Sequence, residues 1–164
     1  MTVQNIEFSK LQGTGNDFVV LDCAAHPEYL EFALNPVYAA KMCNRHYGIG
    51  ADGLVLVLPS NIADTQMRII NSDGSEAEMC GNGIRCFARF VYEQGIVRKE
   101  TMTVETLAGV LVPRMILDAD GSVMGVEVDM GEPILDCAGV PMIGEGQAIS
   151  VPILVEGTEF IITA

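Results

Sequence analysis

Residues 80–94 have the strongest helical periodicity in the chain and read Cys80-Gly81-Asn82-Gly83-Ile84-Arg85-Cys86-Phe87-Ala88-Arg89-Phe90-Val91-Tyr92-Glu93-Gln94. Most positions after the first turn are apolar, and only the stripe Arg85, Arg89 and Glu93 is polar. Such a helix is largely buried in a folded protein. The glycine that follows, Gly95, is typical of a helix C-terminus, so the sequence predicts a buried helix over 80–94.

Strand patterns flank this helix on both sides. Four segments before it are predicted as strands: 6–10, 18–23, 54–58 and 66–71. Five more follow it: 101–106, 110–117, 122–130, 149–155 and 158–164. A polar, Gly-rich tip is expected over 12–17, and Asn35-Pro36 predicts the start of a second helix over 36–46. The pattern indicates an α+β protein.

Length and composition limit the function classes. The chain has 164 residues, a formal net charge of −13 and 49% hydrophobic residues, which predicts one folded domain or slightly more. The negative charge and the lack of a basic stripe argue against a nucleic-acid partner. The sequence shows no secretory signal pattern and no apolar run long enough for a membrane span, so we expect no membrane association. Five cysteines, an odd number, suggest reduced thiols in the cytoplasm.

Cys80 is the cysteine with a chemical context. It precedes Gly81-Asn82-Gly83, where small residues let backbone N–H groups face a ligand, and the helix dipole places partial positive charge there. These features favour a thiolate at Cys80 and a binding place for the carboxylate of a small acid. The alternative is that Cys80 is a small apolar filler, which is the interpretation that we adopt for the other four cysteines.

Other motifs indicate less. The pairs Cys23-x-x-His26 and Cys43-x-x-His46 have zinc-like spacing, but they fall at a strand end and at a helix C-terminus, so we predict no metal. The Gly-rich segments 13–15 and 48–53 lack the pattern of a nucleotide-binding loop and are interpreted as tight connections.

Several segments together resemble the diaminopimelate epimerase family. They are Gln12-Gly-Thr-Gly-Asn-Asp-Phe18, Arg45-His-Tyr-Gly-Ile-Gly-Ala-Asp-Gly53, Asn71-Ser-Asp-Gly-Ser75, Cys80-Gly-Asn-Gly-Ile-Arg85 and Val128-Asp-Met-Gly-Glu-Pro133. The resemblance implies a two-lobe fold, each lobe a β-sheet wrapped around a central buried helix. It also implies an amino-acid epimerase without a cofactor, which interconverts LL- and meso-diaminopimelate for lysine and peptidoglycan precursor biosynthesis.

The resemblance also implies roles for particular residues. Cys80 would be one catalytic base or acid, while Gly81 and Asn82 would bind the substrate carboxylate, and Asn16 and Asn71 would hydrogen-bond the substrate. The second catalytic cysteine of the family, in a Gly-Thr-Gly segment of the second lobe, is not among these residues. Inversion at an α-carbon needs groups on both of its faces, so we expect this chain to be inactive alone.

The same resemblance divides the chain into parts. Residues 1–130 would be the N-terminal lobe, 131–148 a connection, and 149–164 the opening hairpin of a truncated second lobe. The expected partners are the amino-acid substrate and the missing lobe, and the oligomeric state stays open, with a homodimer as one option. Two alternatives remain. One is a related isomerase of the same fold, acting on proline, hydroxyproline or a phenazine precursor, and the other is a truncated, non-catalytic binding domain.

Overall fold

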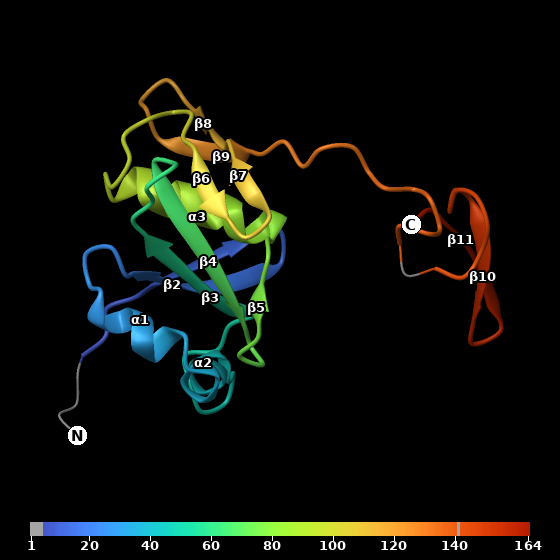
Figure 1. Cartoon of the computed structure of the whole chain (residues 1–164), viewed down its shortest axis with the longest axis horizontal. Coiled ribbons are helices and arrows are strands. Elements are labelled where there is room, and N and C mark those ends of the chain that lie inside the picture. Colours follow the sequence, from blue (N-terminus) through green and yellow to red (C-terminus); the bar gives the residue numbers. More distant parts are fainter. Residues whose placement is uncertain (1–4, 141) are drawn as a thin grey trace. The chain divides into compact units, whose positions relative to one another are not determined.

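The computed structural model describes residues 5–140 and 142–164. The chain divides into two compact units, Met1–Asp129 and Met130–Ala164. The first unit contains β1 (Ser9–Gly13), β2 (Asn16–Asp22), α1 (Glu28–Ala33), α2 (Pro36–Cys43), β3 (Gly53–Leu58), β4 (Thr65–Asn71), β5 (Glu76–Ala77), α3 (Gly81–Glu93), β6 (Val104–Thr106), β7 (Gly109–Leu111), β8 (Arg114–Leu117) and β9 (Val123–Glu127) (Figure 1). Within the described residues, no helix is long and apolar enough to cross a bilayer.

One sheet organises the first unit. Its strands lie in the order β1-β2-β3-β4-β6-β7, with β5 paired to β4, while β8 and β9 form a separate hairpin. The pairs β2–β3 and β4–β6 are parallel, and the other pairs are antiparallel. The parallel β2–β3 pair needs a crossover, which α1 and α2 provide.

Strand β3 is buried along its whole length because both faces of the sheet are covered. Val55 and Val57 pack with Phe87 of α3 in one hydrophobic cluster. Leu54 and Leu56 belong to a second cluster, which includes side chains of α1 and α2. Helix α3 contacts β1, β2, β3, β4 and β9. The expected α+β fold with a sheet around a central buried helix is therefore confirmed for this unit.

The β1–β2 hairpin is tighter than the sequence indicated. Its turn consists of Thr14 and Gly15, which both have positive φ, 53° and 93°. This geometry is that of the two-residue turn that best matches the twist of two antiparallel strands. The predicted hairpin is confirmed, but its bounds differ. Strand β1 begins at Ser9 rather than at residue 6, and Asn16 already pairs with Gly13, so the tip is shorter than the predicted 12–17.

Other boundaries also differ from the prediction. Helix α2 ends at Cys43 rather than at His46. The side chain of Asn44 accepts hydrogen bonds from the backbone N–H groups of His46 and Tyr47, and it thereby starts a separate turn. Pro113 has no N–H for strand pairing, and the predicted strand over 110–117 is split into β7 and β8 around it. Helix α1 and the short β5 were not predicted.

The second unit contains β10 (Val151–Val155) and β11 (Thr158–Ile162), which form an antiparallel hairpin as predicted. Asp136 and Gln147 pair in an isolated antiparallel bridge. Cys137 and Ala148 are buried in this unit. The segment that we assigned to a connection thus contributes buried residues to the second unit.

Candidate active site

The sheet brings the predicted substrate residues to one of its ends. Strands β2 and β3 run parallel, so Asn16 at the start of β2 lies at the same end as Gly53 at the start of β3. Strand β4 runs antiparallel to β3, and its last residue, Asn71, pairs with Gly53. The register of the three strands, rather than their sequence spacing, therefore places Asn16 and Asn71 at one end of the sheet.

Cys80 occupies the N-cap position of α3, as the predicted helix requires. Its backbone is extended, with φ −143° and ψ 119°, and its Sγ accepts the N–H of Gly83 at 3.4 Å. A Cβ on Gly83 would lie 3.0 Å from Cδ1 of Ile69 on β4 and 3.3 Å from the Cβ of Cys80. A glycine at position 83 therefore lets the first turn of α3 approach the sheet while its N–H points at the sulfur.

The first turn of α3 also offers donors to a ligand. The first N–H groups of a helix have no acceptor inside the helix. Gly83 uses its N–H for the Cys80 sulfur, whereas the N–H groups of Gly81 and Asn82 have no protein acceptor within the described residues. These two groups point out of the positive end of the helix dipole, where a carboxylate is stabilised.

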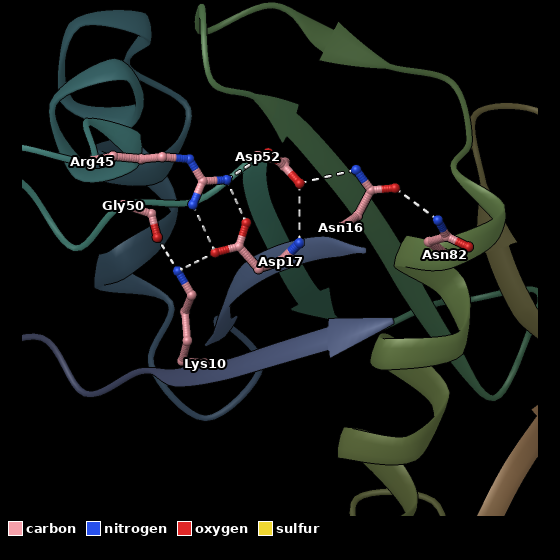
Figure 2. Close-up of polar contacts among 7 residues, drawn as sticks. All are labelled: Lys10, Asn16, Asp17, Arg45, Gly50, Asp52 and Asn82. Carbon is pink, nitrogen blue, oxygen red and sulfur yellow. Dashed lines mark hydrogen bonds and ion pairs between the residues drawn. The ribbon is translucent and has the colours of Figure 1, made fainter. Parts of the chain in front are cut away.

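Asn82 contacts Asn16 directly. The Asn82 Nδ2 donates to the Asn16 Oδ1 at 2.7 Å, and the Asn16 Nδ2 donates to Asp52 Oδ2 at 2.9 Å (Figure 2). The contact joins the start of β2 to the start of α3, which lie 66 residues apart in sequence. The structure therefore brings Asn16 and Asn82 together beside Cys80 and Gly81.

A charged cluster lies behind Asn16, and sequence reasoning missed it. The guanidinium of Arg45 donates to both oxygens of Asp17, at 3.1 and 2.6 Å, and to Asp52 Oδ1 at 2.7 Å (Figure 2). Lys10 forms an ion pair of 2.8 Å with Asp17 and donates to the backbone oxygen of Gly50. The available signal was the presence of Asp17, Arg45 and Asp52 within the quoted family segments.

Asn71 lies near this network in the sheet but is engaged elsewhere. Its Nδ2 donates to Ser75 Oγ at 3.0 Å, and its backbone N–H donates to the Ser75 oxygen at 2.8 Å. Within residues 5–140 and 142–164, no hydrogen bond joins Asn71 to Asn16 or Asn82. Asn71 thus closes the turn after β4, and a role in substrate binding stays a prediction.

The cysteine and histidine pairs do not assemble into a ligand set. Over the described parts of the chain, no three His, Cys, Asp or Glu side chains gather so that they could hold a metal ion. His26 instead pairs with Glu28, Nδ1 to Oε1 at 3.2 Å, and stacks on Tyr29.

Cys80 is expected to be the fastest of the five thiols to react with an alkylating reagent. It is partly exposed, whereas Cys23, Cys43, Cys86 and Cys137 are buried. Burial raises the pKa of Cys23 to about 11, and burial also raises the pKa of Cys43 and Cys86. Competitive labelling of the folded chain with iodoacetamide, followed by peptide mapping, measures the order. Faster labelling of Cys23 or Cys43 would contradict this assignment.

The charged cluster should make the stability of the fold sensitive to acid. The Arg45 hydrogen bonds, and then Lys10, hold the pKa of Asp17 well below its ordinary value of 3.8. A carboxyl with a lowered pKa in the folded state stabilises the fold above its ordinary pKa, and this contribution is lost as the pH falls toward the lowered value. The midpoint of urea denaturation should therefore decrease as the pH is lowered below about 4, and this decrease should be smaller in Arg45→Gln than in the unchanged protein. Equal pH profiles for the two proteins would exclude Arg45 as the cause.

Solved structures with a similar fold define the class of protein. A hydroxyproline epimerase from Agrobacterium vitis matches with a TM-score of 0.59 and 16% identity, over 91% of this chain and 45% of that one. A probable proline racemase from Agrobacterium radiobacter matches with a TM-score of 0.54 and 18% identity, over 71% and 39%. These likenesses show the fold, which is that of the proline racemase and hydroxyproline epimerase structures.

The sequence comparisons identify the family within this fold class. The family model described as diaminopimelate epimerase matches residues 8–135. The chain belongs to the diaminopimelate epimerase family, and the resemblance noted in its sequence is confirmed. A diaminopimelate epimerase from Heliobacterium modesticaldum is 53% identical over 160 residues, and one from Caldanaerobacter subterraneus is 49% identical over 156 residues.

Coverage of these relatives is unequal. The matches span 97% and 94% of this chain but only 57% and 54% of the relatives' own lengths. The chain therefore spans about half the length of the curated relatives it matches.

Proposed function

We propose that this chain supplies one half of the active site of a diaminopimelate epimerase, which interconverts LL- and meso-diaminopimelate in lysine and peptidoglycan precursor biosynthesis. We further propose a cytoplasmic location, where the five free thiols stay reduced. One observation carries the proposal. In a chain of this family, a partly exposed Cys80 caps α3, and the N–H groups of Gly81 and Asn82, which have no acceptor among the described residues, can hold a carboxylate.

In the proposed reaction, the Cys80 sulfur removes the α-proton of the substrate from one face. The N–H groups of Gly81 and Asn82 hold the α-carboxylate, whose oxygens gain negative charge as the α-carbon loses its proton. Donors fixed in advance stabilise that charge without having to reorganise. The N–H of Gly83, 3.4 Å from the sulfur, is placed to donate to a sulfur anion.

A proton must then reach the opposite face of the α-carbon. One rigid side chain cannot serve both faces, so a second acid has to stand across the substrate. The other four cysteines of this chain are buried, which makes them unsuited to that role. We propose that the acid is a thiol of a second lobe, and that the substrate reacts between the two lobes, shielded from water.

Exchange of the substrate α-hydrogen with deuterated water tests this proposal. The chain alone should show no epimerisation. We expect activity from a chimera that joins residues 1–164 to the part of the Heliobacterium modesticaldum relative beyond the aligned region. Proline and hydroxyproline serve as control substrates. Steady epimerisation by the chain alone would refute the two-lobe account, and turnover of proline but not diaminopimelate would refute the substrate.

A further inference from the structure

We propose that Asp52 and Arg45 are positioning residues that orient the side-chain amides of Asn16 and Asn82, so that both present N–H donors to a substrate carboxylate. This inference rests on the proposed function, because it concerns the same site. Neither Asp52 nor Arg45 is assigned a contact with the substrate. Each would act through the two asparagines.

The first step is the orientation of Asn16. An ionised carboxylate only accepts hydrogen bonds, so the group of Asn16 that lies 2.9 Å from Asp52 Oδ2 has to be its NH₂. The backbone N–H of Asp17 donates to the same oxygen at 3.1 Å. Hydrogen bonds from Asn16 and Asp17 keep the pKa of Asp52 below its usual value, so it stays ionised at neutral pH. The carbonyl of Asn16 therefore points away from Asp52 and toward α3.

The second step transmits this orientation to Asn82. The Asn16 Oδ1 accepts from the Asn82 Nδ2 at 2.7 Å, so the carbonyl of Asn82 faces the other way. There it accepts from Arg85, whose Nη2 also donates to Thr14 Oγ1 at 3.2 Å. A guanidinium only donates, so the carboxylate at one end of the chain of hydrogen bonds and the cation at the other favour the same orientation.

With this orientation, Asn16 and Asn82 offer a ligand N–H donors rather than carbonyl acceptors. Each of the two amide carbonyls already accepts a hydrogen bond inside the protein, while each NH₂ group spends one of its two hydrogens there. In the part of the chain that the structure describes, the remaining hydrogens of Asn16 and Asn82 have no acceptor, so they can serve a ligand. A site that offers N–H groups beside a helix N-terminus matches a carboxylate better than an ammonium group.

Arg45 fixes the position of Asp52. Its guanidinium bridges Asp52 and Asp17 and thereby joins the loop after α2 to the start of β2 (Figure 2). The backbone of Asp52 is held as well, since its N–H donates to the Asp17 oxygen at 2.9 Å and its oxygen accepts from Ser72 at 3.1 Å. Arg45 therefore holds a carboxylate whose main chain is already in place, and its planar guanidinium donates in a fixed fork geometry that the single ammonium group of a lysine does not reproduce.

Asp52→Asn tests the proposal because its own amide can accept or donate and no longer dictates the orientation of Asn16. Asp64→Asn is the matched control, since Asp64 also binds a cation, Lys99, and a backbone N–H, that of Thr103, away from the site. In the 164-residue chain, the side-chain ¹H–¹⁵N signals of Asn82, which touches neither aspartate, should move in Asp52→Asn and stay in place in Asp64→Asn.

Kinetics of the chimera give the second measurement. We expect Asp52→Asn to lower kcat/KM for diaminopimelate by about tenfold or more, at the scale of a lost hydrogen bond to a charged group, and Asp64→Asn to leave it within about twofold. Arg45→Lys should also lower kcat/KM for diaminopimelate. Because Arg45 is exposed, this variant is expected to fold, and it tests the inference if Asp52→Asn does not fold. Unmoved Asn82 signals, or equal kinetic losses in both aspartate variants, would overturn the inference. An inactive wild-type chimera would refute the proposed function instead, while the spectra still decide the orientation.

Discussion

Cys80→Ala in the chimera is expected to lower kcat for epimerisation by about 10² to 10⁴, the range that a positioned acid or base supplies. The methyl side chain keeps the first turn of α3 free of new bulk, but it removes the sulfur that faces the N–H of Gly83. Conversion of each isomer, followed by chiral separation of the products, measures the effect.

The two-thiol account makes a further distinction in this variant. The proposed opposite thiol can still remove the α-proton of the isomer whose α-proton faces it. For that isomer alone, slow exchange of the α-hydrogen with deuterated water should persist, and it should occur without inversion. Cys86→Ala is the control, because Cys86 lies in the same helix but is buried. Epimerisation at an undiminished rate in Cys80→Ala would exclude Cys80 from the mechanism. Inactivity of a well-folded Cys86→Ala would show that the assignment of the catalytic thiol to Cys80 is wrong.

Phe87→Ala should have the largest effect on stability. Phe87 is the largest of the fully buried side chains and joins α3 to β3 and β4 in one hydrophobic cluster. Truncation of a buried phenylalanine costs about 3–5 kcal/mol, through lost burial and the cavity that is left. Small domains are stable by only about 5–15 kcal/mol, so the variant should lose much of its margin. Urea denaturation followed by circular dichroism measures the change.

An exposed phenylalanine of the same unit provides the control. Phe8 is 46% exposed, and Phe8→Ala should cost less than about 1.5 kcal/mol, because folding buries only part of this side chain. A cost for Phe87→Ala no greater than that for Phe8→Ala would mean that α3 is not the centre of the core.

Local sequence was enough to place α3 and Cys80. The apolar periodicity of residues 80–94 depends on neighbours three and four positions apart, and the observed helix, Gly81–Glu93, agrees with it. Gly95 follows with a φ of 69°, the conformation that the predicted helix end requires. Strand β3 was equally evident, since Leu54–Leu58 is an uninterrupted apolar run.

Boundaries were wrong where a few atoms decide between local alternatives. The side chain of Asn44 competes with the helix for backbone N–H groups, and this competition leaves no trace in the hydrophobic pattern. The turn at Thr14-Gly15 was similarly hidden, because Gly13, Gly15 and their polar neighbours suit a loop of several lengths.

The residue pattern alone indicated the central helix, the thiol at its start and, through the resemblance, the family. Only the tertiary structure showed the network that holds Asn16 and Asn82. Arg45 meets Asp17 across 28 residues, Asn16 meets Asp52 across 36, and Asn82 meets Asn16 across 66. These contacts exist because β2 and β3 run parallel and α3 starts at the same end of the sheet. Strand order and register are fixed by the packing of the whole core, which the spacing of residues along the chain does not reveal.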